Sequence, residues 1–360
     1  MCEYHRKTFA SIALRNISHN FEVLSSRMNN SKLIPVVKAD AYGHGADAIV
    51  RHLYYNHGVR LFAVSLLEEA KALYSLGLDI DILIMGPLDE DDLPVVSKYG
   101  FVLTVTSDRM WNSVQAFSGS LRFHVKVDTG MHRLGLKSEH AIKEIFKVSL
   151  EKSTLHLEGL YTHFATADSD EAYFLKQKET FRNIVSHLPW KPPIIHASNS
   201  SAIIKYENDL ESTTHSRVGI ALYGYTLERH VDFLKPAMTL HTQVAEINAL
   251  KRGDKLGYNI TYEASENELI AILPIGYGDG WIRKNQGGSV VIRDKLYPIV
   301  GRVCMDMTFV RIDASVSQGD EVILFGDTTV TADTVAKRTN TISYEVLCLI
   351  GKRVPRVYNN

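Results

Sequence analysis

Hydrophobic and polar positions alternate in two different ways along the chain. Through the first two thirds, short apolar runs rich in β-branched residues are followed by segments whose apolar residues recur every three or four positions. The first pattern is typical of buried strands and the second of amphipathic helices. The strand-like runs cover residues 33–38, 61–65, 82–85, 101–105, 123–127, 157–163, 194–197 and 218–222, and helix-like segments include 67–76, 140–150 and 172–188. This α/β alternation predicts a TIM-like (β/α)8 barrel, although a shorter open sheet also satisfies the pattern.

The pattern changes near residue 235. Strand-like segments at 239–250, 254–262, 269–274, 289–292 and 321–325 are separated by turns rich in Gly, Asp and Asn, and helical periodicity nearly vanishes before 344–349. This pattern of short strand-like segments and turns predicts a mainly-β domain. We therefore expect a barrel over residues 1–235 and a β-domain over residues 236–360, joined at the segment 234–236.

Composition excludes several classes of partner. Among the 360 residues, 45% are hydrophobic and 22% charged, and the net charge of −1 gives no reason to expect nucleic acid or an anionic membrane as partner. No apolar run is long enough to span a membrane, and no signal-like apolar stretch follows the N-terminus, so we expect a cytoplasmic protein. Three scattered cysteines, Cys2, Cys304 and Cys348, predict neither a disulfide framework nor a metal site.

Polar residues recur where the predicted barrel strands end, which is where such barrels carry their chemistry. Lys38 ends the first run, and a lysine at the end of a buried strand is a candidate for Schiff-base chemistry with an aldehyde cofactor. A solvent-exposed lysine at a strand end is the simpler explanation when Lys38 is taken alone. The other polar residues at strand ends, which together favour the site, are Lys126, Asp128, Arg133, His163, His196, Asn199, Ser200 and Arg217.

A phosphate site is expected from the loops after the last two strands of such a barrel. Ser200 offers a hydroxyl there, and the backbone N–H groups of Gly219 and Ile220 offer further donors. Tyr42 can add its hydroxyl from the first strand end. A lysine for an aldehyde and donors for a phosphate together indicate pyridoxal 5′-phosphate as the cofactor.

The chain resembles the bacterial alanine racemases. The segments that carry the resemblance are 36–45, 128–135, 196–200, 217–224, 257–258, 276–280, 301–306 and 341–345. They follow one another in order over nearly the whole chain. Two details depart from the common family pattern: Gly278 stands where alanine is frequent, and Ala197-Ser198 where Cys-Ala is frequent. Neither position supplies an atom on which the expected chemistry depends.

The resemblance implies a racemase that uses two bases and acts on L- and D-alanine. Lys38 would bind the cofactor and act as the base on one face of Cα. Tyr258 would act on the opposite face, and in the family it reaches the site from a second subunit, so a homodimer is implied. Two bases suit racemisation because a proton leaves one face and another returns to the opposite face. D-alanine for peptidoglycan synthesis is the product that the family supplies.

The same resemblance assigns roles around the cofactor ring. Arg217 would face the pyridine nitrogen, and because arginine stays protonated, that nitrogen should stay neutral and the ring should be a weaker electron sink. His163 would link Arg217 to Tyr258. Arg133 would contact the cofactor phenolic oxygen and the substrate carboxylate. Lys126 corresponds to a family lysine that is often carbamylated and then orients Arg133, while an unmodified lysine paired with Asp128 is the alternative.

The remaining positions complete the implied site. Met305 would donate its backbone N–H to the substrate carboxylate from the partner subunit, and Tyr344 would contact the phosphate. Asn199 would assist the cofactor and His196 would support it. Tyr277, Arg302 and Asp306 would line the entry path. Cys304 receives no catalytic role.

Three other functions compete with this interpretation. A non-catalytic barrel protein that carries pyridoxal phosphate would lack the second domain with Tyr258 and Met305. A decarboxylase of similar architecture would place an acidic residue where Arg217 stands. A racemase of another amino acid, such as serine, shares the motifs, but its broad-specificity members tend to be exported.

Overall fold

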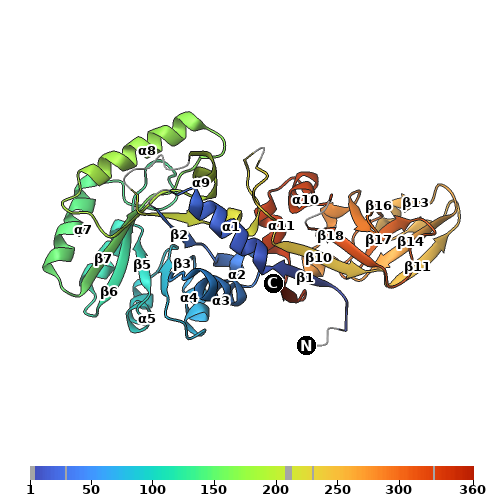
Figure 1. Ribbon diagram of the computed structural model, residues 1–360, viewed down its shortest axis with the longest axis horizontal. Helices are drawn as coiled ribbons and strands as arrows, with labels where there is room; N and C mark the ends of the chain where they lie inside the picture. Colours follow the sequence, from blue (N-terminus) through green and yellow to red (C-terminus); the bar gives the residue numbers. More distant parts are fainter. Residues whose placement is uncertain (1–4, 29–30, 207–212, 229–230, 327–328) are drawn as a thin grey trace. The chain divides into compact units, whose positions relative to one another are not determined.

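The computed structural model describes residues 5–28, 31–206, 213–228, 231–326 and 329–360. The chain forms two compact units. One comprises Ser18–Ala41 and Ala46–Leu234, and the other comprises Met1–Ile17, Tyr42–Gly45 and Lys235–Asn360. Each unit is built around its own sheet (Figure 1).

The first unit contains eight parallel strands, in the order β2-β9-β8-β7-β6-β5-β4-β3. Their bounds are β2 Lys32–Pro35, β3 Leu61–Val64, β4 Asp81–Ile84, β5 Val102–Val105, β6 Leu121–Lys126, β7 Leu155–Tyr161, β8 Ile194–His196 and β9 His215–Val218. A parallel bridge between Val36 and Ala63 joins the first and last strands of this order. The predicted eight-stranded barrel is confirmed, and the open sheet is excluded.

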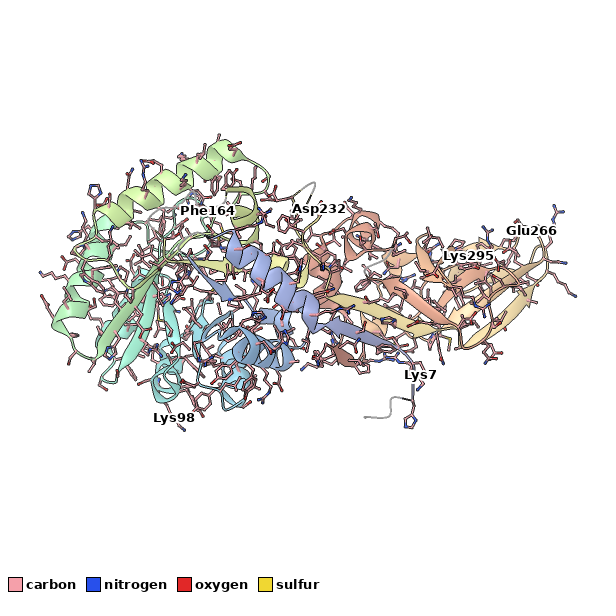
Figure 2. All side chains as sticks on the ribbon, viewed as in Figure 1. Lys7, Lys98, Phe164, Asp232, Glu266 and Lys295 are labelled. Carbon is pink, nitrogen blue, oxygen red and sulfur yellow. The ribbon has the colours of Figure 1, made fainter. Side chains whose placement is uncertain are left out.

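Helices alternate with the strands along the chain, and the longer ones cover the outside of the barrel (Figure 1). Their bounds are α1 Leu14–Ser26, α2 Lys38–Tyr42, α3 Ala46–His57, α4 Leu67–Tyr74, η1 Glu90–Asp92, α5 Leu93–Tyr99, α6 Asp108–Ala116, α7 Glu139–Glu151, α8 Glu171–Ser186, α9 Ser200–Tyr206 and η2 Ile220–Tyr223. Side chains at Ser107, Ser138 and Asp170 cap three of these helices by accepting backbone N–H groups. Phe164 is buried in this unit, whereas Lys98 is exposed on α5 (Figure 2).

Two predicted strand ends are wrong, and both corrections lie at the site. The run expected at 218–222 splits into β9, which ends at Val218, and the 3₁₀ helix η2. Gly219 makes this break because its φ of −106° and ψ of −107° fit neither a strand nor a helix. The first run ends at Pro35, and Lys38 begins α2 instead of ending the strand.

The second unit is built on a nine-stranded sheet, in the order β11-β14-β17-β16-β15-β18-β10-β1-β19. The strand bounds in this unit are β1 Phe9–Ala13, β10 Met238–Gln243, β11 Glu246–Leu250, β12 Lys255–Leu256, β13 Tyr262–Glu263, β14 Glu268–Leu273, β15 Ser289–Ile292, β16 Lys295–Val300, β17 Thr308–Ile312, β18 Glu321–Phe325 and β19 Arg356–Asn359. The predicted mainly-β character is confirmed.

The N-terminal strand β1 belongs to this sheet and pairs with β10 and β19. The expected barrel over residues 1–235 therefore differs from the compact unit, which excludes β1. The partner strands lie more than two hundred residues away, so no local pattern reveals the pairing.

Helices also occur in the second unit: η3 Tyr258–Ile260, η4 Tyr277–Asp279, η5 Arg283–Asn285, α10 Ala332–Thr339 and α11 Ser343–Leu349. The helix α10 lies in the stretch before residue 344 where helical periodicity was expected nearly to vanish. It is short and polar, and its start depends on Thr331, whose hydroxyl accepts the N–H of Thr334. None of the described helices is long and apolar enough to cross a membrane.

Candidate active site

Lys38 opens a left-handed turn at the end of the first barrel strand. The residues Ala39, Asp40 and Ala41 have φ values of 52°, 53° and 55°. Residues other than glycine avoid this region, and Tyr42 continues it with a φ of 53°. Four such residues in succession represent stored backbone strain. Lys38 itself is half-buried. Strain of this kind is typical of functional sites, because the surrounding structure must hold the backbone in place.

Carboxylates hold this turn from both sides. The Ala39 N–H donates to Oε1 of Glu69 over 2.6 Å, and the Ala46 N–H donates to Oδ1 of Asp40 over 2.7 Å. The other oxygen of Glu69 accepts the backbone N–H groups of Ser65 and Leu66. Glu69 thus ties the turn after β2 to the loop after β3 and fixes where Lys38 begins.

Arg217 lies near the centre of the barrel and is only 3% exposed. Its Nη2 donates to the carbonyl oxygens of Thr162 (2.8 Å) and Ala197 (2.9 Å) and to Nδ1 of His163 (3.2 Å), while Nη1 donates to Nδ1 of His196 (2.8 Å). Burial lowers the pKa of Arg217 to about 10. The guanidinium therefore stays charged at neutral pH, although none of these acceptors is acidic.

Lys126 ends β6 and is 5% exposed, with its ammonium 5.6 Å from the ring centroid of Tyr161. Burial, together with the nearby charges of Arg133 and Arg217, lowers the pKa of Lys126 to about 8. The ion pair with Asp128, which was the alternative to carbamylation, is not formed. Asp128 instead accepts from the ring and backbone of His132.

The barrel end is therefore rich in positive charge and poor in negative charge. Within the described part of the chain, no carboxylate forms an ion pair with Lys126, Arg133 or Arg217. Arg133 is exposed, yet near enough to Lys126 and Arg217 to lower the pKa of both. Buried cations without acidic partners are costly, so this end of the barrel fits an anionic ligand. A phosphorylated cofactor with a phenolate oxygen and an amino-acid carboxylate would supply such charge.

The expected phosphate donors lie together after β8 and β9. The Ser200 hydroxyl accepts the backbone N–H groups of Gly219 (3.1 Å) and Ala221 (3.3 Å). The Ile220 N–H donates to no residue that the structure describes. Asn199 has a different local role, because its Oδ1 accepts the Ala202 N–H and so caps α9. The Gly219 N–H is thus given to Ser200, which leaves the Ser200 hydroxyl and the Ile220 N–H as donors. Asn199 holds the start of α9, the helix that carries Ser200.

Tyr42 and Tyr344 lie together in the second unit, with ring centroids 6.1 Å apart. Burial raises the pKa of Tyr42, and proximity to Tyr344 and Cys348 adds to the effect. The Tyr42 hydroxyl therefore keeps its proton and remains a hydrogen-bond donor. This pairing suits the two tyrosines that were expected to contact a phosphate.

Large side chains are exposed elsewhere in the second unit. Tyr258 is 68% exposed, Met305 52% and Tyr277 41%, and Ile260 and Met307 are also exposed. Their loops are joined: Gly278 donates its N–H to the Met305 carbonyl over 2.9 Å. Exposed groups of apolar residues mark interaction surfaces. We call the five residues Tyr258, Ile260, Tyr277, Met305 and Met307 the apolar loop set.

Polar contacts also organise these loops. Arg353 forms an ion pair with Asp306 over 2.7 Å, and Gly257 lies against the backbone of Arg302. A side chain at Gly278 would approach Nη1 of Arg353 to 2.4 Å, so glycine at this departure from the family pattern leaves room for the arginine. The Met305 N–H donates to no described residue, as a substrate-binding donor requires.

The structure brings two residues into the site that the sequence analysis missed. The ring of Tyr161 stacks on His196 with centroids 4.5 Å apart, and Nδ1 of His124 lies 3.0 Å from Nε2 of His196. Both lie on the inward face of their strands, since His124 is two residues before Lys126 and Tyr161 two before His163. The alternation of strand residues was the signal that could have found them.

Comparisons with known proteins agree along the whole chain. The family profile described as "Alanine racemase, N-terminal domain" matches residues 12–227, and "Alanine racemase, C-terminal domain" matches residues 237–358. Alanine racemase of Geobacillus kaustophilus is 37% identical over 99% of this chain and 96% of its own length. Alanine racemase 1 of Bacillus subtilis is 35% identical over 99% of this chain and 94% of its own length.

Solved structures give the same result. The crystal structure of alanine racemase from E. faecalis is 34% identical, covers 99% of both chains and superposes with a TM-score of 0.94. Alanine racemase from Bacillus anthracis, solved with bound L-Ala-P, is 32% identical, covers 100% of this chain and 96% of its own, and has a TM-score of 0.92.

Proposed function

The chain belongs to the alanine racemase family and is an amino-acid racemase, and from this premise we propose that it interconverts L- and D-alanine with pyridoxal 5′-phosphate and two bases. The observation that carries the proposal is the set of buried cations at the barrel end without acidic partners. D-alanine made in this way would serve peptidoglycan synthesis.

Pyridoxal phosphate, when bound to an amino acid, withdraws electrons from Cα and so weakens the Cα–H bond. In the first unit, Lys38 would hold the cofactor covalently, and Ser200, Gly219 and Ile220 would bind its phosphate. Tyr42 and Tyr344 would add hydroxyl donors to that phosphate. Once the substrate has displaced it, the Lys38 amine would move a proton at one face of Cα.

Arg217 would direct an N–H at the ring nitrogen of the cofactor. Its charge persists at neutral pH, and a charged donor beside the nitrogen disfavours protonation of that nitrogen. The ring then remains a moderate electron sink, which favours return of the proton over other reactions. The acidic residue that a decarboxylase would place here is absent, because the described partners of Arg217 are two carbonyls and two histidines.

Arg133 and the Met305 N–H would bind the substrate carboxylate. Lys126 would hold Arg133 in place as a carbamate: its amine forms a bond to the carbon of CO₂, and the amine proton passes to water. Carbamylation needs the neutral amine, and the pKa of Lys126, lowered to about 8 by burial, makes that form available. The product is an anion beside buried cations, so it supplies negative charge that this end of the barrel lacks.

Tyr258 would move the proton at the opposite face of Cα, in the site of a partner chain. Its ring is exposed within the apolar loop set, and a second copy of the chain would cover that set. His163, whose Nδ1 accepts from Arg217, would present its Nε2–H to this tyrosine. Tyr277, Arg302 and Asp306 would line the approach to the site. We thus propose a homodimer with two shared sites.

A racemisation assay over a panel of L-amino acids tests the function. We expect alanine to be converted to an equal mixture of enantiomers, with the highest kcat/KM of the panel. Higher kcat/KM for serine would identify a serine racemase. Absence of racemisation of any amino acid by the cofactor-loaded protein would contradict the proposal.

A further inference from the structure

A row of hydrogen bonds runs from Arg217 through His196 to His124 inside the barrel. Nη1 of Arg217 lies 2.8 Å from Nδ1 of His196, and Nε2 of His196 lies 3.0 Å from Nδ1 of His124. Both imidazoles are fully buried. Neither contact is explained by packing alone, because apolar side chains would fill the same space without needing partners.

The direction of this row follows from the donors available. Arginine has no acceptor, so Nδ1 of His196 is unprotonated for as long as this hydrogen bond is made. A neutral imidazole carries one N–H, which His196 then holds on Nε2 and donates to Nδ1 of His124. His124 in turn must carry its hydrogen on Nε2, an atom that is buried and has no partner among the described residues. Every donor in the row therefore points away from Arg217.

We propose that His124 is a positioning residue for Arg217: by accepting from His196, it keeps His196 in the tautomer that accepts from the arginine. This inference deepens the proposed function and rests on it, because the arginine matters as the group that faces the cofactor ring. The loss of the His124 acceptor would let His196 place its hydrogen on Nδ1, where it would oppose the arginine N–H.

The surrounding structure is shaped to hold His124. A side chain at Gly159 would come within 2.7 Å of the His124 ring, so only glycine fits on the adjacent strand. The pairing of β6 with β7 shifts register between Phe123 and His124. Tyr161 stacks on His196 from the same strand as Gly159.

Both histidines also stay neutral. Burial, assisted by the charge of Arg217, lowers the pKa of His196 well below its ordinary value. Burial lowers the pKa of His124 to about 3, with further lowering from His215, Arg122 and Arg217. Near neutral pH, protonation therefore does not change which atoms donate in the hydrogen bonds among Arg217, His196 and His124.

The hydrogen bonds to His196 and its neighbours determine which N–H groups of Arg217 remain open to a ligand. With its outer N–H groups given to His196, His163 and two carbonyls, the Nε–H and the second Nη1–H of Arg217 have no acceptor among the described residues. Those N–H groups are the ones left for a ligand. His124 thus acts on the cofactor only through His196 and the arginine.

The test compares two variants of similar size in the cofactor-loaded enzyme. His124→Gln keeps a strong acceptor, its amide oxygen, whereas His124→Met leaves only a weakly accepting thioether sulfur. Selective ¹⁵N labelling of histidine and NMR report the tautomer of His196, whose signals are assigned by their loss in His196→Gln. The same samples give kcat, KM and the pyruvate released per racemisation, which rises when the ring becomes a stronger electron sink.

We expect the wild type and His124→Gln to hold the His196 hydrogen on Nε2. His124→Met should show a mixed tautomer, a kcat lower by roughly tenfold with little change in KM, and more pyruvate per turnover. An unchanged tautomer in His124→Met would overturn the proposal, and so would equal losses in both variants. If His124→Met does not fold, the wild-type spectrum decides, because a hydrogen on Nδ1 of His196 contradicts the row. The NMR result does not depend on racemisation. Failure of the proposed racemase function can therefore be distinguished from failure of this inference.

Discussion

Asp128 follows Lys126 by two residues, yet its carboxylate accepts from His132 and not from the lysine. Its Oδ2 lies 3.0 Å from Nδ1 of His132, and its Oδ1 accepts the His132 N–H over 2.9 Å. Although burial opposes ionisation, the backbone hydrogen bonds from His132 and Gly130 hold the pKa of Asp128 below its usual range. The carboxylate is thus committed elsewhere, and Lys126 is left as a buried amine in need of negative charge.

We predict that CO₂ adds to Lys126. Only the neutral amine reacts, so carbamylation should rise as pH increases through the lysine pKa of about 8. The reaction can be followed by ¹³C NMR of the protein in ¹³C-bicarbonate, which should show one slow-exchanging carbamate that disappears in Lys126→Gln. Lys137, which is exposed beside the same Asp128, is the matched control and should form no stable carbamate. A carbamate signal that persists in Lys126→Gln would contradict the assignment.

Lys38→Ala is expected to lose covalent attachment of the cofactor. The amine is the group that bonds to the aldehyde, so borohydride reduction followed by peptide mass analysis should label Lys38 in the wild type and give no labelled peptide in the variant. Lys32→Ala, which alters an exposed lysine of β2, should behave like the wild type. Labelling of another lysine with a native absorption spectrum in Lys38→Ala would show that the cofactor lysine is elsewhere.

Tyr258→Phe is predicted to affect proton transfer at one face of Cα and not at the other. Because the equilibrium between the enantiomers is fixed, racemisation should fall equally in both directions, by roughly a hundredfold or more for loss of a general base. In D₂O, however, one enantiomer should still exchange its Cα hydrogen without inversion, through Lys38, while the other should not.

The control for this experiment is Tyr55→Phe, which changes a tyrosine that is 67% exposed on α3. It should leave exchange of both enantiomers unaltered. Equal residual exchange of both enantiomers in Tyr258→Phe would argue against a base specific to one face.

Stability should fall in mild acid because buried histidines resist protonation. Burial lowers the pKa of His124 from 6.5 to about 3, so between these values the unfolded chain binds a proton that the folded chain does not. The free energy of unfolding therefore keeps its full value above pH 6.5 and declines as pH falls. At pH 5 the neutral His124 lowers it by about 2 kcal/mol. Urea unfolding at pH 5 and pH 7.5 measures it.

His124→Gln removes this titrating group and should reduce the difference between the two pH values by that amount. His156→Gln, an exposed histidine on β7, is the matched control and should leave the difference unchanged. Identical pH dependence in the wild type and in His124→Gln would show that His124 is not a neutral buried group.

Much of the barrel could be predicted because its signals are local. Each strand carries its own apolar run, and each polar residue at a strand end follows directly, so Arg217, His163 and His196 could be expected near one another before any distance was known. The site also depends on a turn that no pattern gives: Ala39, Asp40 and Ala41 are ordinary residues in an unusual backbone region, held there by Glu69 from the next βα unit.

The β unit was harder to predict for the same reason. The strand β1 finds its partners in β10 and β19, and a run of five residues carries no information about neighbours so distant in sequence. His124 was missed because it lies within a strand and not at its end. Its importance depends on the hydrogen bond to His196, which becomes visible only when β6, β7 and β8 are side by side.

The sharing of one site by two chains is tested most directly by mixing Lys38→Ala with Tyr258→Phe. The two variants, carrying different affinity tags, are co-expressed and the hybrid dimer is isolated. If Tyr258 acts in the partner's site, one site of each hybrid carries both substitutions and the other carries neither, so the hybrid should regain about half of the wild-type activity. If Tyr258 acts within its own chain, every site keeps one defect, and a purified hybrid no more active than the separate variants would contradict the shared site.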